Sequence, residues 1–221
     1  MTREDIEKLV DPKHLIAAVT WMTLGDGNIT IPSNGVNGFF QVVHRESSED
    51  YIRMKQALLS SVTHVTAKKC WHSGQNSYNW QLWTKCHPTF TKLRARIYLD
   101  GRKILSEHAI KLLSPCCLAI LYQDDGRYNQ SKSTISINKP LFSELELMAL
   151  AKYIVDTYGI IFRVRRSCTL KDGSIGHELA LRYSDKDKFF ELIEPFVVPS
   201  MFYKVSTGGS ANHTDDIVCT A

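Results

Sequence analysis

The chain has 221 residues, enough for one domain or for two small ones that each bury a core. Hydrophobic residues make up 43% and charged residues 23%, as in an ordinary globular protein, and no apolar run of 18 residues is present that could cross a membrane. The net charge is only +4, but eight lysines and arginines against one acid lie between residues 64 and 103, and four more lie in residues 162–171. Such basic segments indicate either a polyanion bound on one face or a solvated charged surface, and composition alone does not favour one over the other.

The first half of the chain predicts a helix, strands and two further helices. Asp11 and Pro12 have the chemistry of a helix start, and the helix runs to Gly27. A polar, strand-like stretch over 28–45 precedes a helix with acids in its first turn at 47–62. A hairpin over 64–84 turns near Ser73 and Gly74 and leads to a short helix at 87–98, before the half closes on an exposed Lys103.

The second half repeats this order. Ser114 and Pro115 begin a helix that reaches Gly126, and residues 127–139 are strand-like, with Ile135 and Ile137 in alternation. A helix at 143–159, a hairpin over 159–184 turning at Asp172 and Gly173, a helix at 185–196 and an exposed Lys204 follow. The sequence therefore predicts an α+β fold of two pseudo-symmetric α-β-β-α-β-β-α repeats. We expect these repeats at 1–105 and 114–206, with a linker at 106–113 and a weakly ordered tail at 207–221.

An acid and a glycine end the first helix of each repeat, in "TLGDGN" and "YQDDGR". Taken singly, each Asp-Gly pair is best explained as a left-handed helix cap. As a pair, Asp26 and Asp125 end two nearly uncharged helices that lack a polar outer face and carry small residues, which predicts that the two helices are buried against each other. Two carboxylates at two negative helix ends repel each other.

A divalent cation would resolve this repulsion, because carboxylates and free terminal carbonyls are ligands that suit Mg²⁺. Acids holding Mg²⁺ beside basic strands predict phosphodiester hydrolysis. The matched spacing of 77 residues from Asp26 to Lys103 and 79 from Asp125 to Lys204 predicts that a lysine of each repeat joins the catalytic site. The alternative for each lysine is an ordinary surface residue or a phosphate clamp.

The two acidic helix ends, together with "VPSMFYKV", resemble the motifs of the LAGLIDADG homing endonucleases, in their single-chain branch. The resemblance implies a saddle of antiparallel sheets with the motif helices at the interface, in a monomer that binds double-stranded DNA. It implies metal binding by Asp26 and Asp125, with backbone carbonyls from Gly25 and Asp124, and peripheral catalytic lysines at Lys103 and Lys204. It also implies cleavage of both strands at a long asymmetric target, short 3′ overhangs and mobility of a host intron.

On such a saddle, alternate polar side chains of the strands are expected to contact DNA. The candidates are Asn28, Ser33, Asn34, Gln41, Lys68, Lys69, Gln81, Arg127, Ser133, Ser136, Arg163, Arg165 and Lys171. A shift of one residue in register would exchange the two faces of a strand. Trp80 is expected in the core instead.

Two other classes of function compete with a nuclease. A nuclease-inactive RNA maturase or DNA-binding protein on the same scaffold would use the basic strands, but it would have no need of two buried acids. A structural protein would explain the repeat but not the basic strands. Six cysteines without a CxxC pair, and a charged N-terminus unlike a secretory signal, predict an intracellular protein, whether bacterial, phage or organellar. The termini lack intein splicing chemistry, so we expect a free-standing or intron-encoded protein.

Overall fold

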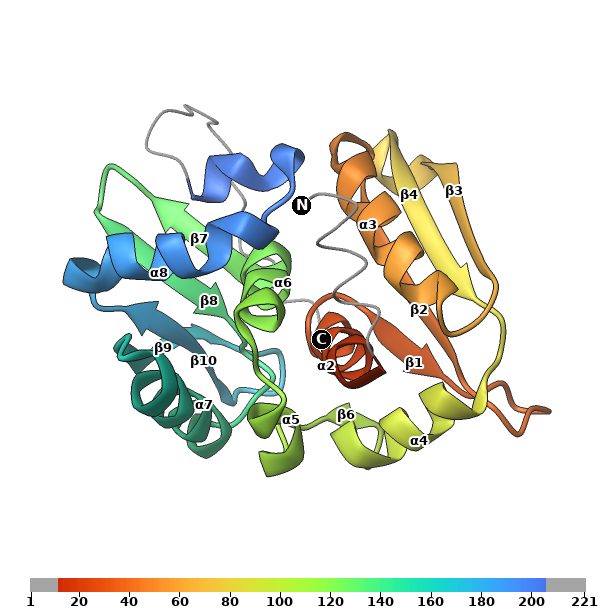
Figure 1. Ribbon diagram of the computed structural model, residues 1–221, viewed down its shortest axis with the longest axis horizontal. Coiled ribbons are helices and arrows are strands. Elements are labelled where there is room, and N and C mark those ends of the chain that lie inside the picture. The colour runs from red at the N-terminus through yellow and green to blue at the C-terminus, as the bar shows by residue number, and fades with distance from the viewer. Residues whose placement is uncertain (1–11, 206–221) are drawn as a thin grey trace.

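The computed structural model describes residues 12–205, so Asp11 and the tail predicted at 207–221 lie outside the described residues. Its elements form two similar halves on either side of a central pair of helices, α2 (Pro12–Leu24) and α6 (Pro115–Asp125) (Figure 1). The α+β fold with antiparallel sheets is confirmed. Within the described residues, no helix is long and apolar enough to cross a membrane.

The first half follows α2 with a four-stranded antiparallel sheet in the order β1-β2-β4-β3. The strands are β1 (Asn28–Thr30), β2 (Phe39–Arg45), β3 (Val65–His72) and β4 (Ser77–Thr84). Helix α3 (Glu49–Ser60) packs on β3 and β4, and α4 (Pro88–Ile97) packs near β1 and β2. Short 3-10 turns at Glu46–Ser48 and Ser73–Gln75 join these elements, the second at the predicted hairpin turn.

The second half repeats the arrangement with a sheet in the order β7-β8-β10-β9. Its strands are β7 (Gly126–Asn129), β8 (Thr134–Asn138), β9 (Phe162–Thr169) and β10 (Ile175–Leu181). Helix α7 (Glu144–Tyr158) packs on β9 and β10, and α8 (Lys186–Ile193) packs on α6. Gly173 has a φ of +84° in the β9–β10 turn, so the predicted turn uses glycine for its left-handed conformation. Three 3-10 turns complete the half, at Tyr183–Asp185, Glu194–Phe196 and Pro199–Lys204.

The segment between the halves is ordered. A two-stranded hairpin, β5 (Tyr98–Leu99) with β6 (Arg102–Lys103), precedes helix α5 (Glu107–Lys111), which occupies most of the segment expected as a linker. Ala109 and Ile110 of α5 are buried, and the helix contacts both α2 and α7. The linker therefore helps to fix one half against the other.

The two central helices are buried, as their lack of charge predicts. Every residue from Cys116 to Gln123 in α6 is buried, and Ala18, Val19 and Trp21 of α2 have no exposed surface. The two helices lie next to each other at the centre of the molecule and are in contact (Figure 1). Their carboxyl ends meet, because the Asp26 backbone N–H donates to the Asp124 carboxylate across the interface, at 3.2 Å.

Candidate active site and nucleic-acid surface

The two motif acids stand at the meeting ends of α2 and α6. Asp26 follows α2 and keeps 40% of its side chain exposed, whereas Asp125 ends α6 with 19% exposed. Gly27 and Gly126 follow them, but neither has a positive φ, so the expected left-handed caps are absent. A Cβ on Gly27 would lie 2.4 Å from the Phe40 ring, and one on Gly126 would lie 2.2 Å from the Tyr122 ring. These glycines are needed for space rather than for backbone conformation.

The acids at this interface repel one another, as the sequence predicts. Burial and the neighbouring carboxylates Asp124 and Asp125 raise the pKa of Asp26 to about 7. Burial also raises the pKa of Asp125, although the Lys139 ammonium, which contacts its carboxylate, opposes the shift. Carboxylate oxygens that repel one another, one of them accessible, fit a divalent cation.

Both predicted lysines point into this region, although they are half-buried rather than exposed. The Lys103 ammonium donates to the carbonyl oxygens of Gly25 at 2.9 Å and Gly27 at 2.7 Å, on either side of Asp26. Lys204 donates to the Gln123 carbonyl oxygen at 2.8 Å, two residues before Asp125. Burial lowers the pKa of Lys103 to about 8, and the neighbouring Lys139 adds to the effect. The Gly25 carbonyl, which is expected as a metal ligand, therefore also accepts a hydrogen bond from Lys103.

The sequence did not single out two residues next to the acids. His44 ends the inward face of β2, and its Nδ1 lies 3.7 Å from a carboxylate oxygen of Asp26. Lys139 follows β8, contacts Asp125 and donates to the Leu24 carbonyl oxygen at the end of α2, at 2.8 Å. In both strands the inward positions are otherwise apolar, and a polar residue comes at the end of this series. This pattern is the sequence signal that could have identified His44 and Lys139.

The carboxylate of Asp124, whose backbone carbonyl is the expected metal ligand, is held by side chains of α3. Its side chain is fully buried and accepts hydrogen bonds from Lys55 Nζ at 2.7 Å and from the Tyr51 hydroxyl at 2.8 Å, both on α3. Burial alone would raise the pKa of Asp124, but Lys55, His44 and Tyr51 outweigh it and lower the pKa. Asp26, His44 and Asp124 are the only described residues grouped closely enough to resemble a metal cluster, yet the Asp124 carboxylate is already neutralised by Lys55.

The sheet register decides which predicted DNA contacts share a surface. In the first sheet, Asn28 lies opposite Gln41, and Lys68 opposite Gln81, on the face away from the core, which we call the first outer face. Lys69 lies on the other face, where it pairs with Glu46 and its ammonium lies 4.9 Å from the centre of the Tyr78 ring, so Lys68 and Lys69 do not share the first outer face. Trp80 is buried as expected.

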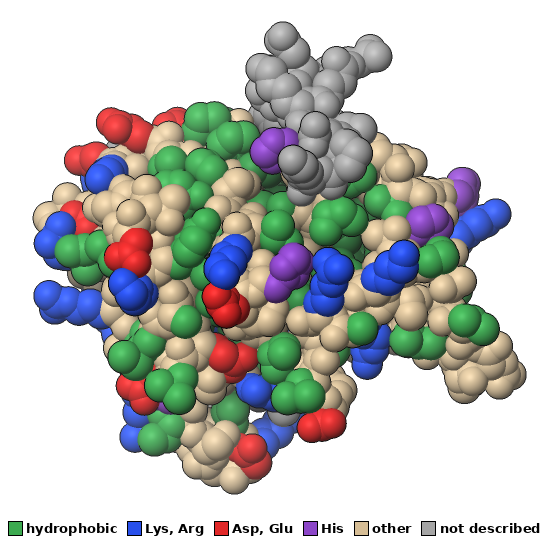
Figure 2. Space-filling view, turned by 60° about the horizontal axis from the view of Figure 1, so that its bottom comes forward, with side chains coloured by type: hydrophobic (Ala, Val, Ile, Leu, Met, Phe, Trp, Pro, Cys, Tyr) green, Lys and Arg blue, Asp and Glu red, His purple; other side chains and the backbone are tan. Residues whose placement is uncertain are grey.

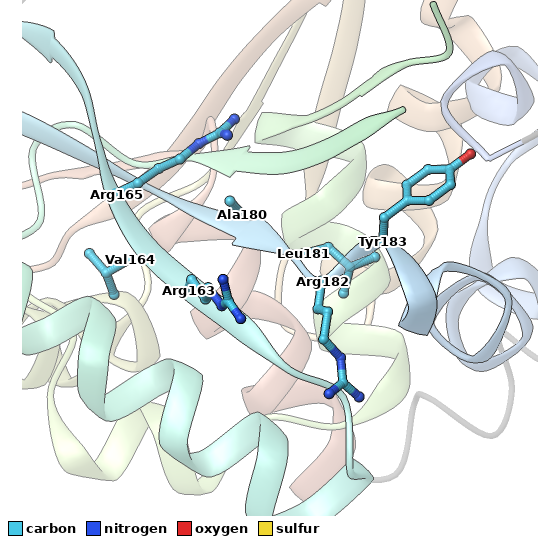
Figure 3. A pocket seen from close by; sticks show the side chains of 7 residues that line it. All are labelled: Arg163, Val164, Arg165, Ala180, Leu181, Arg182 and Tyr183. Carbon is cyan, nitrogen blue, oxygen red and sulfur yellow. The ribbon is translucent and has the colours of Figure 1, made fainter. Parts of the chain in front are cut away.

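The second sheet has a matching second outer face, with Arg127 opposite Ser136 and Arg163 opposite Ala180. Ser136 is on this face but only 6% exposed, which leaves it little surface for contact. Arg163 and Arg165 project from β9 beside a hollow that Ala180 and Arg182 also line (Figure 3). Arg165 pairs with Glu178, at 2.6 Å. The remaining candidates lie at the strand turns: Ser33, Asn34, Ser133 and Lys171.

Charge is distributed unevenly over the surface. Figure 2 shows one face on which the charged side chains at the right of the view are mainly lysine and arginine. Acidic and basic side chains are mixed at the left. Charge is uneven along the sequence too, with an excess of basic residues between residues 64 and 103.

Three kinds of curated protein resemble the chain. Protein RecA of Mycolicibacterium flavescens is 33% identical over 196 residues, which are 82% of this chain and 44% of that relative, so the chain spans less than half of its length. DNA endonuclease I-ChuI of Chlamydomonas applanata is 26% identical over 203 residues, 86% of this chain and 93% of the relative. Cytochrome b mRNA maturase bI2 of Debaryomyces hansenii is 28% identical over 127 residues, 56% of this chain and 44% of the relative.

Solved structures show the same fold. Homing endonuclease I-WcaI bound to its DNA recognition sequence superposes with a TM-score of 0.73 at 18% identity, over 92% of this chain and 91% of that one. A variant of I-DmoI in complex with its target DNA in the presence of Mg gives a TM-score of 0.53 at 12% identity, over 82% and 96%. The sequence profile described as the LAGLIDADG DNA endonuclease family matches residues 17–179. The chain therefore belongs to the LAGLIDADG DNA endonuclease family, as its two acidic helix ends indicated.

Proposed function

We propose that the protein is a sequence-specific DNA endonuclease that hydrolyses both strands of a long asymmetric target, with Mg²⁺ as cofactor. The observation that carries this proposal is the meeting of the carboxyl ends of α2 and α6, where Asp26 and Asp125 interact electrostatically, between two outer faces that carry polar and basic side chains. Family membership supports the reaction class, and the DNA-bound I-WcaI and I-DmoI structures support the substrate.

Asp26 and Asp125 would hold the divalent cation, and their mutual repulsion supports this role because a cation offsets it. The bound cation would polarise the scissile phosphate and lower the pKa of a bound water. Lys103 uses two of its three N–H groups on the Gly25 and Gly27 carbonyls, so the third is free to stabilise charge on the phosphate. Lys204 has the corresponding place beside α6. Short 3′ overhangs and mobility of a host intron complete the proposal.

A nuclease-inactive RNA-binding protein is the competing function, and the maturase relative supports it. Retention of both acids and both lysines favours the nuclease. RNA binding by the wild-type protein, together with no cleavage of any DNA target in Mg²⁺, would favour the maturase instead.

The proposal is tested on the DNA that the enzyme would recognise before insertion of its own reading frame. The candidate target is the sequence obtained by joining the DNA on either side of the element that carries the gene. The wild-type protein should cut both strands of this duplex in Mg²⁺ and neither strand in EDTA. Equal degradation of a scrambled duplex would contradict sequence specificity.

Asp125→Asn should abolish double-strand cutting but leave DNA affinity within about twofold, because it removes a cation ligand and not a contact of the outer faces. Asp26→Asn should do the same. Cleavage is followed on a labelled duplex, and affinity by gel shift in EDTA. Asp100→Asn, in the exposed β5–β6 turn, is the control and should cut at the wild-type rate. Double-strand cutting by Asp125→Asn at the wild-type rate would contradict the proposed site.

A further inference from the structure

A lysine occupies a core position in one repeat where the other repeat has a leucine. The two sheets align through equivalent pairs, Asn28 opposite Gln41 and Arg127 opposite Ser136. When this alignment of the two repeats is extended to the helices that follow, the buried residues of α3 and α7 correspond: Ile52 to Leu147, Lys55 to Leu150 and Leu59 to Ile154. Lys55 is fully buried, and Leu150 is 1% exposed. A lysine is rarely buried without a partner, so this position needs an explanation.

The partner of Lys55 comes from the opposite repeat. Its ammonium donates to the Asp124 carboxylate at 2.7 Å and lies 4.3 Å from the centre of the Tyr51 ring. Tyr51 donates to the same carboxylate at 2.8 Å. The residue equivalent to Asp124 in the first repeat is Gly25, and a Cβ there would lie 2.1 Å from the Asp124 carboxylate. The cluster of Lys55, Tyr51 and Asp124 therefore exists on one side of the pseudo-twofold axis only. Gly25 has no side chain and so leaves room for the Asp124 carboxylate.

A contribution to stability does not explain why the Lys55–Asp124 ion pair is buried. Taking two charges out of water costs several kcal/mol per ion, and well-packed apolar residues such as those of α7 often do as well or better. The role of the cluster is therefore better inferred from the residues that it contacts. Two of these contacts lead to Asp26.

The first contact is direct. Asp124 holds its second carboxylate oxygen against the Asp26 backbone N–H, at 3.2 Å. The second passes through His44, whose Nε2 lies 2.9 Å from Lys55 Nζ. Because a lysine bound to a carboxylate is an ammonium with no lone pair, Nε2 must accept this hydrogen bond, and the ring proton must be on Nδ1. Nδ1 is the nitrogen that faces the Asp26 carboxylate, at 3.7 Å.

We propose that Lys55 is a positioning residue for the Asp26 half of the site, because it anchors Asp124 against the Asp26 backbone and fixes the His44 ring with its N–H toward the Asp26 carboxylate. This role deepens the proposed endonuclease function and rests on it. Asp125 has no such support, since Lys139 contacts it directly and Leu150 replaces the buried lysine. Loss of Lys55 should therefore affect the two halves of the site unequally.

The first experiment needs no DNA and no metal. Long-range proton–nitrogen spectra of histidine side chains distinguish the two neutral tautomers, and His44→Gln assigns the His44 signals. The wild-type protein should show the Nδ1–H tautomer of His44, and Lys55→Met should lose this fixed state. A wild-type His44 protonated on Nε2, or a tautomer unchanged in Lys55→Met, would overturn the proposal.

The second experiment resolves the two strands. Each strand of the target duplex carries a different label, and single-turnover rate constants are measured for both. Lys55→Met should change the ratio of the two rate constants about tenfold or more, since small errors in orientation are costly to catalysis. Leu150→Met, at the equivalent position of α7, is the matched control and should leave the ratio unchanged.

A double variant separates positioning from folding. Lys55→Met with Asp124→Asn removes both charges, so no unpaired buried charge remains and the fold should be retained. The altered strand ratio should persist, because the His44 ring is still unsupported. A folded double variant with the wild-type ratio would overturn the proposal. If the wild-type protein cut no target at all, the endonuclease function would fail, while the histidine spectra would still decide whether Lys55 positions His44.

Discussion

Asp26 has a partly exposed carboxylate that lies near two other carboxylates, those of Asp124 and Asp125. Its pKa is raised to about 7 from an ordinary value of 3.8, by burial and then by Asp124 and Asp125, with Lys55 and Lys139 opposing. The folded state therefore binds this proton more tightly than the unfolded chain, and stability falls as the pH rises from about 4 to about 7. The metal-free protein is expected to lose stability across this window.

Asp26→Asn removes this dependence, so the variant should be more stable than the wild type at pH 8 and equally stable near pH 3. We expect a gain of about 1 kcal/mol, discounted for solvent screening because 40% of the side chain is exposed. Urea unfolding in EDTA at both pH values measures it. Asp100→Asn should show no such difference between the two pH values, and an Asp26→Asn variant less stable than the wild type at pH 8 would contradict the assignment.

The helices α3 and α7 show how similar local signals lead to different local structure. Both follow a serine, and both carry acids in their first turn. In α7, Ser143 forms a capping box, in which its hydroxyl accepts the Glu146 backbone N–H at 3.3 Å and the Glu146 carboxylate accepts the Ser143 backbone N–H at 2.7 Å. In α3, Ser48 makes no such bond.

Ser143→Ala should therefore lower the free energy of unfolding by about 1 kcal/mol, as the loss of a cap does. Ser48→Ala is the matched comparison and should cost less, since no capping bond is lost. Chemical denaturation of both variants at pH 7 measures the two effects. Equal losses of unfolding free energy in the two variants would show that the capping hydrogen bond of Ser143 does not stabilise the protein.

The elements were predictable from the sequence because their signals are local. Helix starts at Pro12 and Pro115 and turns at Ser73 and Gly173 depend on neighbouring residues only. The internal repeat then indicated that the two acidic ends meet. The contacts around Asp124 were not predictable, because its partners lie 69 and 73 residues away and a buried polar pair leaves no periodic signal. Which of the adjacent candidates Lys68 and Lys69 lies on the outer face was not predictable either, because strand register is set by pairing and not by composition.

At the scale of the molecule, one chain supplies two outer faces and two unequal halves of a site. Counterion release makes binding to duplex DNA weaken with salt, by a slope of about −0.9 for each phosphate neutralised. Arg163 is exposed on the second outer face, whereas Arg53 lies on α3, stacked on Trp80 from the core side of the first sheet. These two arginines carry the same charge on different surfaces.

Arg163→Ala should therefore weaken binding to duplex DNA and make the slope of log affinity against log salt shallower by about 0.9, whereas Arg53→Ala should leave the slope unchanged. Fluorescence anisotropy in EDTA, over a series of salt concentrations, measures both. The comparison separates the outer face from net charge, because both variants lose one positive charge. If Arg53→Ala changed the slope as much as Arg163→Ala, the overall charge of the protein and not the second outer face would account for the salt-dependent binding, which would contradict the proposed role of that face.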